Sequence, residues 1–193
     1  MRQATPTDRP FVIKTIAAAF HDNKSTNYVI KQDSQTPVRL RRLVGYCYNM
    51  CRRFGDVWMS DDGKACALVM LPHRQKTTAQ TIGWDIKLAT GAIGITRVGK
   101  MMARESAIKK NHPMQPFAYL WYIGVDPQQQ GRGSGSSLLS GIIDHYAKQD
   151  LPLYLETSME RNLPWYTKHG FEAYHHIDFG FTLHMLRREV RQA

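Results

Sequence analysis

The sequence predicts one α/β domain in which helices flank a mixed β-sheet. Segments with strand periodicity and segments with helix periodicity are mixed without strict alternation, and the turn-forming run Asp61-Asp62-Gly63-Lys64 joins two strand-like segments. A buried strand before residue 126 leads through a glycine-rich loop into an amphipathic helix. The 193 residues suit a single domain with a real core, so residues 1–193 are expected to fold together.

The first third of the chain is expected to be mostly helical. A short strand at residues 2–4 precedes a helix, because apolar residues recur at helical spacing from Ile13 to Phe20. Residues 21–36 are polar and are expected to form a loop. Pro37 then opens a second helix with one apolar stripe, and Gly55 ends it.

The middle of the chain is expected to hold a hairpin and a weakly patterned segment. Strands are expected at residues 57–60 and 65–71, on either side of the turn. Residues 73–112 carry weak helical patterns that glycines interrupt, and prolines then force an extended break at residues 113–116. The remaining elements, in order, are a strand at 117–125, a loop at 126–136, a helix over Leu138–Tyr146, a strand at 153–155, a short helix from Asn162 to Gly170 and two strands within 171–186.

Charge and cysteine content narrow the class of protein. The net charge of +10 and the pI near 9.7 favour an anionic partner, such as nucleic acid, a membrane surface or a phosphate-bearing cofactor. The number of cysteines is odd, and the spacing of Cys47, Cys51 and Cys66 matches no zinc finger. We therefore expect reduced thiols and no metal. The polar N-terminus has no signal core and no apolar run is long enough to cross a bilayer, so a cytoplasmic protein is expected.

The most informative segment runs from Val125 to Ser136. Gly131, Gly133 and Gly135 stand at every second position, so side chains leave the backbone amides unshielded. Amides at a helix start are unpaired and carry positive potential, which suits a phosphate group, and Arg132 adds a charge.

Other interpretations of this loop fit less well. A P-loop requires a lysine after the glycines, and none is present. In a dinucleotide-binding fingerprint that starts at Gly131, the third glycine would fall on Ser136, although Glu156 lies roughly where a ribose-binding acid is expected. A flexible loop without a ligand is the remaining alternative.

Gln130-x-x-Gly133-x-Gly135 after Val-Asp-Pro resembles the acetyl-CoA signature of the GNAT superfamily of N-acetyltransferases. The resemblance continues in two later segments. One is a second strand, which ends in Leu155-Glu-Thr-Ser158, and the other is the run Arg161-Asn-Leu-Pro-Trp-Tyr-Thr-Lys-His-Gly-Phe171. The Glu-Thr-Ser and Arg-Asn-Leu-Pro runs, with the Asp61-Asp62-Gly63 hairpin, are similar to the puromycin N-acetyltransferase branch.

This resemblance implies a mostly antiparallel sheet in which two parallel strands splay apart to admit the pantetheine arm of acetyl-CoA. A backbone amide at the strand end would face the acetyl oxygen and stabilise an oxyanion. The pyrophosphate would lie on the amides of the glycine loop. The implied cofactor-binding residues are Ile123, Gly124, Val125, Gln130, Gly131, Arg132, Gly133, Ser134, Gly135, Ser136 and Asn162.

The resemblance also implies two proton-transfer roles. Tyr166 matches the family's general acid, which would protonate the departing thiolate. Glu156 is the nearest acid to the motif and is our candidate for the base that deprotonates the amine, with His184, His175 or His176 as alternatives. Tyr119, Trp121 and Tyr122 belong either to the sheet core or to the acceptor pocket.

The predicted function is direct acetyl transfer from acetyl-CoA to a primary amine of a small molecule, antibiotic-like or aminonucleoside-like, in a ternary complex. Residues 22–36 and 73–112 are expected to shape the amine pocket of a monomer or homodimer. The alternative is a non-catalytic module that binds acyl-CoA or, through its arginines, nucleic acid. No nucleic-acid-binding motif is visible, so nucleic acid is not an expected partner.

Overall fold

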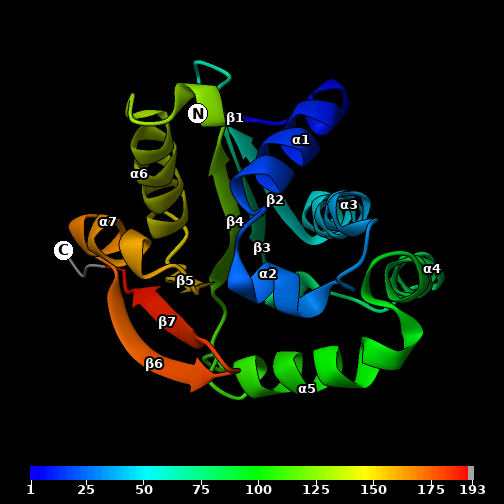
Figure 1. Cartoon of the computed structure of the whole chain (residues 1–193). Coiled ribbons are helices and arrows are strands. Elements are labelled where there is room, and N and C mark those ends of the chain that lie inside the picture. Colours follow the sequence, from blue (N-terminus) through cyan, green and yellow to red (C-terminus); the bar gives the residue numbers. More distant parts are fainter. Residues whose placement is uncertain (191–193) are drawn as a thin grey trace.

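The computed structural model describes residues 1–190, in which seven strands form one sheet (Figure 1). The strand order is β1-β2-β3-β4-β5-β7-β6, and every neighbouring pair is antiparallel except β4 and β5. The strands are β1 Arg2–Gln3, β2 Gly55–Met59, β3 Ala65–Met70, β4 Ala118–Val125, β5 Leu153–Thr157, β6 Glu172–Asp178 and β7 Thr182–Arg188. The predicted mixed, mostly antiparallel sheet is confirmed.

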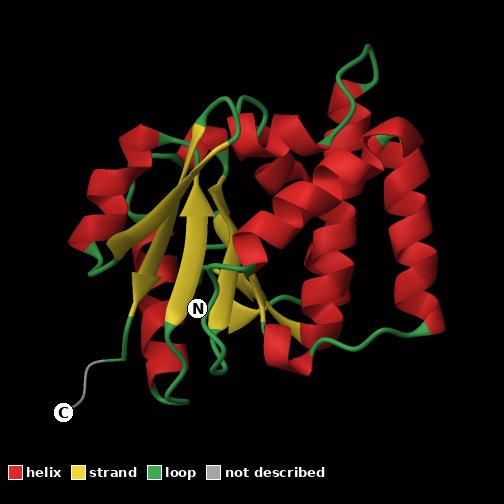
Figure 2. Cartoon of the chain, turned by 90° about the horizontal axis from the view of Figure 1, so that it is seen from below, coloured by secondary structure: helices red, strands yellow, loops and turns green. Residues whose placement is uncertain are grey.

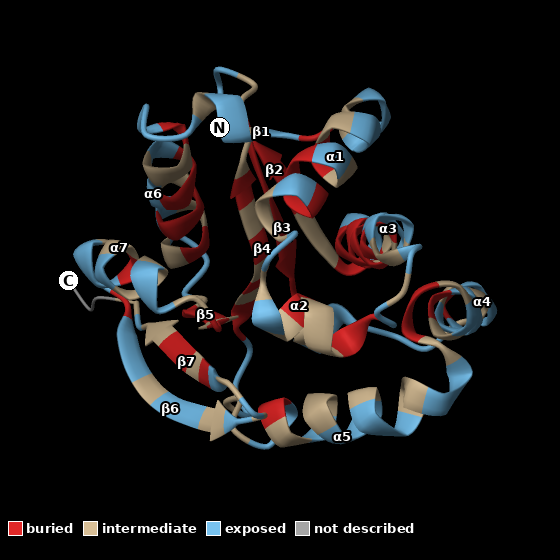
Figure 3. Cartoon of the chain, viewed as in Figure 1, coloured by how far each residue is buried: buried red, intermediate tan, exposed pale blue. Residues whose placement is uncertain are grey.

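Helices cover both faces of this sheet, as the view in Figure 2 shows. Helices α6 and α7 pack on one face, while α1 and α3 pack on the other, with α2, α4 and α5 on that same side (Figure 1). The helices are α1 Arg9–Ala19, α2 Lys24–Val29, α3 Thr36–Phe54, α4 Ala79–Leu88, α5 Val98–Lys109, α6 Ser134–Ala147 and α7 Leu163–Lys168. The centre of the sheet is buried, whereas the edge strand β6 is largely exposed (Figure 3).

Two apolar cores lie on the two faces of the sheet. The stripe predicted for the second helix is buried, because Leu40, Val44, Cys47 and Cys51 of α3 pack against α1 and the sheet. On the opposite face, α6 contributes Leu138, Leu139 and Ile142 to the second core. The three cysteines are buried and are not paired with one another. Burial of this apolar surface is the main source of the fold's stability.

The structure corrects two predicted boundaries. Residues 21–36 are not all loop, because α2 forms within them: the Asn23 side chain accepts a hydrogen bond from the Thr26 amide (3.0 Å) at the start of α2. Thr26, Val29 and Ile30 are buried, and this i, i+3, i+4 spacing was a helix signal within a polar segment. The glycine-rich loop ends at Gly133, so the last residues assigned to it belong to the first turn of α6.

Gly55 ends α3, as predicted, and close packing against β3 requires a glycine there. Its backbone is extended rather than left-handed. A Cβ at this position would lie 2.1 Å from the Val69 carbonyl oxygen, so only glycine allows β3 to approach so closely.

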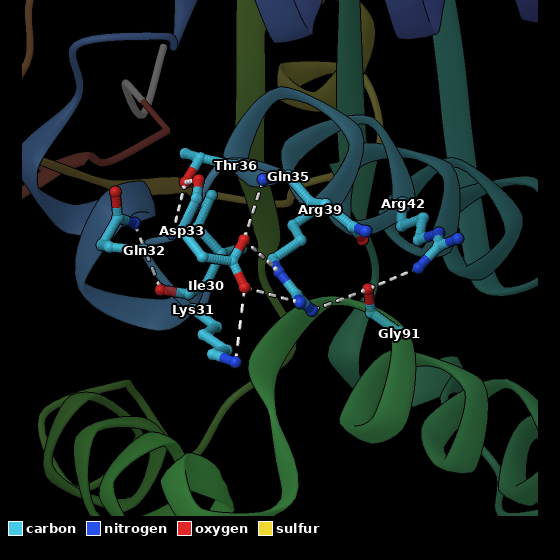
Figure 4. A network of polar contacts seen from close by, with 9 residues as sticks. All are labelled: Ile30, Lys31, Gln32, Asp33, Gln35, Thr36, Arg39, Arg42 and Gly91. Atoms are coloured by element: carbon cyan, nitrogen blue, oxygen red, sulfur yellow. Dashed lines mark hydrogen bonds and ion pairs between the residues drawn. The ribbon is translucent and has the colours of Figure 1, made fainter.

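The segment between β3 and β4 folds into α4, α5 and short helical turns beside α3. Figure 4 shows how it is attached. Arg39 binds both oxygens of Asp33, with its Nε 3.0 Å from Oδ1 and its Nη2 2.8 Å from Oδ2. Arg39 and Arg42 both donate to the Gly91 carbonyl, at 3.3 and 2.8 Å. Asp33 also lies 3.4 Å from Lys31 Nζ. The Arg39 guanidinium holds the pKa of Asp33 well below its usual range, so the carboxylate stays ionised.

Candidate active site

Strands β4 and β5 separate shortly after they begin. Their parallel ladder consists of only two pairs, Ala118 with Leu153 and Tyr119 with Tyr154. Beyond these pairs β4 continues to Val125 without pairing to β5. The backbone groups that β4 turns toward β5 are therefore not used in that ladder, and an extended ligand chain can hydrogen-bond there. This is the splay implied by the family resemblance.

The glycine-rich loop joins this open end of β4 to α6. Gly131 and Gly133 have φ angles of +77° and +86°, a region that side chains disfavour, and a Cβ on either would meet nothing within 4 Å. At Gly135 a Cβ would lie 3.0 Å from Val125 Cγ2, so glycine allows α6 to pack closely on β4. Two glycines thus serve the turn and the third serves the packing.

The main-chain N–H groups of residues 131–136 donate no hydrogen bond to another residue of the described range 1–190. They lie at the positive end of α6, where unpaired donors are expected. The Ser134 hydroxyl instead donates to Asp62 Oδ2 (2.6 Å), and Ser136 Oγ accepts from Trp165 Nε1 (2.9 Å). The serine side chains therefore fix the loop, while its amides and open surface fit a diphosphate.

Asp62, in the β2–β3 turn, is the residue that anchors this loop. Hydrogen bonds from Ser134 and Ser60 lower the pKa of Asp62 to about 2. Its carboxylate is therefore ionised at neutral pH and accepts from both hydroxyls. The predicted hairpin thus supports the start of α6.

Helix α7 places Tyr166 in the core on the α6 face. The Tyr166 ring contacts Trp165 and Phe171, with ring centroids 4.8 and 5.7 Å apart. Its hydroxyl makes no hydrogen bond to another residue in the described range, and burial raises the pKa of Tyr166 well above its usual value. Tyr166 is therefore protonated at neutral pH and can only donate a proton. Asn162 occupies the N-cap position of α7, and its side chain makes no capping hydrogen bond.

Glu156 lies two residues beyond the last β4–β5 pair. Its Oε1 is 2.8 Å from His112 Nε2, and its Oε2 accepts a hydrogen bond from the Tyr119 hydroxyl. The Glu156 side chain is only 5% exposed. Burial and the Glu156 charge raise the pKa of Tyr119 well above its usual value, so this hydroxyl remains a donor to the carboxylate.

The Glu156 side chain lines a cavity of about 790 Å³, which lies on the side of the sheet that helices α1 to α5 cover. Tyr119, Trp121 and Tyr122 all line it, and the same three residues also belong to the core on this face or pack against it. A bulge at Trp121 makes this possible, because Leu68 pairs with Tyr122 and Val69 with Leu120, so Trp121 is the extra residue. Residues within 22–36 and 73–112, the segments expected to shape the amine pocket, supply much of the remaining wall of this cavity.

The candidate residues thus fall on two faces. Tyr166 packs in the core under α6 and α7, whereas Glu156 borders the cavity on the opposite face. The open end of the β4–β5 pair lies between them. His175 and His176 are on the exposed edge strand and do not line the cavity, and His184 is paired with Thr157 on β5.

Sequence reasoning did not identify His112 as a partner of the carboxylate. His112 stands directly before Pro113, at the end of the weakly patterned segment 73–112. It is 44 residues from Glu156, and its ring lies between Phe117 and Tyr119, at centroid distances of 5.1 and 5.3 Å. No local pattern signals this contact, because the fold alone brings the two residues together.

Among residues 1–190, no group of three or more His, Cys, Asp or Glu side chains is arranged to hold a metal ion. No helix in this range combines the length and apolar character needed to span a bilayer.

A sequence model of the acetyltransferase (GNAT) family matches residues 4–171. Among curated proteins, the chain is 40% identical over 53 residues to an uncharacterized N-acetyltransferase of Schizosaccharomyces pombe. It is 39% identical over 59 residues to a mycothiol acetyltransferase of Acidimicrobium ferrooxidans. These matches cover 28% and 29% of this chain but only 22% and 19% of the relatives' lengths.

The fold has solved counterparts over the whole chain. A Corynebacterium glutamicum protein described as histone acetyltransferase HPA2 and related acetyltransferase superposes with a TM-score of 0.67 at 20% identity, covering 100% of this chain and 97% of that one. At this identity the likeness concerns the fold.

Proposed function

The chain belongs to the acetyltransferase (GNAT) family, and we propose that it moves an acetyl group from acetyl-CoA directly to the primary amine of a small molecule. The observation that carries this proposal is the short β4–β5 ladder. It leaves an open strand end between the amides of residues 131–136 and the cavity beside Glu156. A donor held on the amides and an amine held in the cavity would meet at that opening.

For the donor, we assign the phosphates to the unpaired amides from Gly131 to Ser136, with Gln130 and Arg132 beside them. The backbone of Ile123, Gly124 and Val125 would hold the pantetheine arm, and Asn162 would contact the cofactor from the start of α7. Acetyl-CoA supplies the activated thioester. The positive end of α6 supports this assignment, because it favours a multiply charged anion.

In the transfer, the acetyl carbon loses its bond to sulfur and gains a bond to the amine nitrogen. The ammonium must lose protons and the thiolate gains one. We assign the first task to Glu156, whose ionised form accepts hydrogen bonds, and the second to Tyr166, whose burial keeps it protonated. Donor and acceptor would approach the opening from different sides, so both would be bound at the same time. The acetyl group would therefore pass directly between them in a ternary complex.

Similarity to the puromycin N-acetyltransferase branch makes an antibiotic or aminonucleoside amine the first acceptor class to examine. The free, buried thiols also support a reducing cytoplasmic setting.

A thiol-release assay with acetyl-CoA and a panel of primary amines tests the proposal. We expect release that depends on the amine, and a rise in Tm with acetyl-CoA but not with NAD. A Tm shift with no release for any amine would instead indicate a non-catalytic acyl-CoA-binding protein. No shift at saturating acetyl-CoA would remove the cofactor assignment.

A further inference from the structure

The wall of the cavity that borders Glu156 is unusually rich in rings and thioethers. Aromatic rings come from the residue after α1, from α3, and from β4 and the segment before it, and methionines come from α3, β3 and α5. The rings are those of Phe20, Tyr46, Phe117, Tyr119, Trp121 and Tyr122, and the methionines are Met50, Met70, Met101 and Met102. A volume of about 790 Å³ lies within the range typical of pockets for drug-sized ligands. These rings and methionines contribute to the binding free energy of a ligand that buries apolar surface against them.

The charges of the cavity differ in sign from those of the whole chain. Three carboxylates line it, those of Asp85, Glu105 and Glu156, against two cations, Arg104 and Lys109, which gives a net charge of 2 − 3 = −1. The chain as a whole carries +10. Arg104 is already engaged, with Nη1 2.5 Å from Glu105 Oε1 and Nη2 2.5 Å from Ser25 Oγ. The cavity therefore favours a cation, whereas most of the surface favours anions.

The rim of the cavity is apolar as well. Ile86 on α4 and Met102 on α5 both line the cavity, yet they are 59% and 62% exposed. At the edge of the pocket, these two side chains offer apolar surface that an apolar ligand can bury. The body of the occupant would therefore reach from the β4 rings to the helices α4 and α5.

From the apolar wall, the net negative charge and the apolar rim of the cavity, we propose that the acceptor is an amphipathic amine. It carries one primary ammonium, which lies beside Glu156, and a bulky apolar body that is preferably aromatic. This inference rests on the proposed acetyl transfer and adds the substrate class. Polyamines and amino sugars are disfavoured, because some of their additional charges and hydroxyls would lie against the rings and methionines of the wall and lose water without gaining a partner there.

The experiment compares kcat/KM for 4-phenylbutylamine, n-butylamine, spermidine and glucosamine in the thiol-release assay. We expect the ring to raise kcat/KM by about 10- to 100-fold over n-butylamine, the effect of burying one aromatic side chain. The two polar amines should be the poorest substrates. Equal values with and without the ring, or a preference for spermidine or glucosamine, would overturn the inference while leaving acetyl transfer intact.

Two rim variants test whether this cavity is responsible. Ile86→Gln and Met102→Gln change exposed residues and should leave the fold intact, and both should reduce the preference for the ring several-fold without changing KM for acetyl-CoA. Ile82→Gln is the matched control, because Ile82 lies one turn away on α4, is 48% exposed and does not line the cavity. Equal loss in all three variants would contradict a specific role of the rim.

Binding without acetyl-CoA separates this inference from the proposed function. Titration of 4-phenylbutylamine against the intact chain, followed by tryptophan fluorescence, should show saturable binding, and n-butylamine should bind at least about 10-fold more weakly. If the ring-bearing amine binds and no amine is acetylated, the proposed function fails and the inference stands. If acetylation occurs but the ring gives no gain in affinity, the inference alone fails.

Discussion

The two sides of the β4–β5 opening are built in different ways. On the α6 side, the candidate donor site is made of backbone: a twelve-residue run from Val125 to Ser136 supplies its amides. On the α1–α5 side, the cavity is made of side chains from many elements, and Glu156 is held there by His112 and Tyr119. A backbone site depends on a few special conformations, whereas a side-chain site depends on the whole tertiary fold. Variants on the α6 side should therefore change acetyl-CoA binding, and variants on the cavity side should change the reaction of the amine.

The largest effect is expected for Gly133→Glu. A carboxylate at the positive end of α6 would repel the phosphates and should weaken acetyl-CoA binding at least about 100-fold, measured by calorimetry. Gly180→Glu is the matched control: its φ of +82° resembles the +86° of Gly133, it also has open space, and it lies in the β6–β7 turn. Retained binding in Gly133→Glu would move the donor site away from this loop.

Glu156→Gln should lower kcat by about 100-fold or more, because the amide cannot accept the amine proton. The rise of rate with pH should flatten, and the Kd for acetyl-CoA should not change. Glu160→Gln, on the exposed turn before α7, is the control. An unchanged pH profile in Glu156→Gln would assign the proton to another group, with His184 the next to test.

Tyr166→Phe should lower kcat by about 10- to 100-fold while the Tm shift with acetyl-CoA persists, because only the donor hydroxyl is lost. Tyr174→Phe, which removes a hydroxyl hydrogen-bonded to the Asn111 carbonyl, should leave the rate unchanged. Equal rates in wild type and Tyr166→Phe would mean that water protonates the departing sulfur.

The smallest effect is expected for Arg39→Gln, which loosens the attachment of the segment between β3 and β4. Arg39 lowers the pKa of Asp33 in the folded state, so the ion pair stabilises the fold above the ordinary carboxyl pKa of about 4. That stabilisation is lost as the pH falls below this value and Asp33 is protonated. The Tm difference between wild type and variant should therefore be present at neutral pH and shrink in acid.

The same variant should raise KM for the amine several-fold without affecting acetyl-CoA, since Arg39 supports only the cavity side. Arg41→Gln is the control, because Arg41 is exposed on the same helix and forms no ion pair with a residue in the described range. A Tm difference that does not depend on pH would contradict the role of the Asp33 charge.

The sequence could predict the parts of the molecule in which local pattern decides the structure. The hairpin turn at Asp61–Lys64, the apolar stripe of α3 and the glycine-rich loop each carry their signal within a few residues, and all are confirmed as elements. Helix α2 was missed because its six residues are mostly polar and its N-terminal signal is a single capping side chain, Asn23. Short helices depend on tertiary contacts for their stability.

The cavity could be predicted only in outline. The segments that shape it were identified, yet the contact of His112 with Glu156 and the extra residue at Trp121 depend on register and on chain distance. The roles of Glu156 and Tyr166 stay predictions. Their placement on opposite faces is what the variants test.

The segment from Pro72 to Phe117 leaves the sheet and returns to it at nearly the same point. Met70 at the end of β3 is paired with Tyr119 near the start of β4. The whole segment is therefore topologically one long excursion from a single hairpin, and its two ends are fixed by the sheet. A different segment grafted at that junction would replace the part of the cavity wall that α4, α5 and the turns between them supply, while the rings on α3 and β4 and the loop before α6 would stay in place.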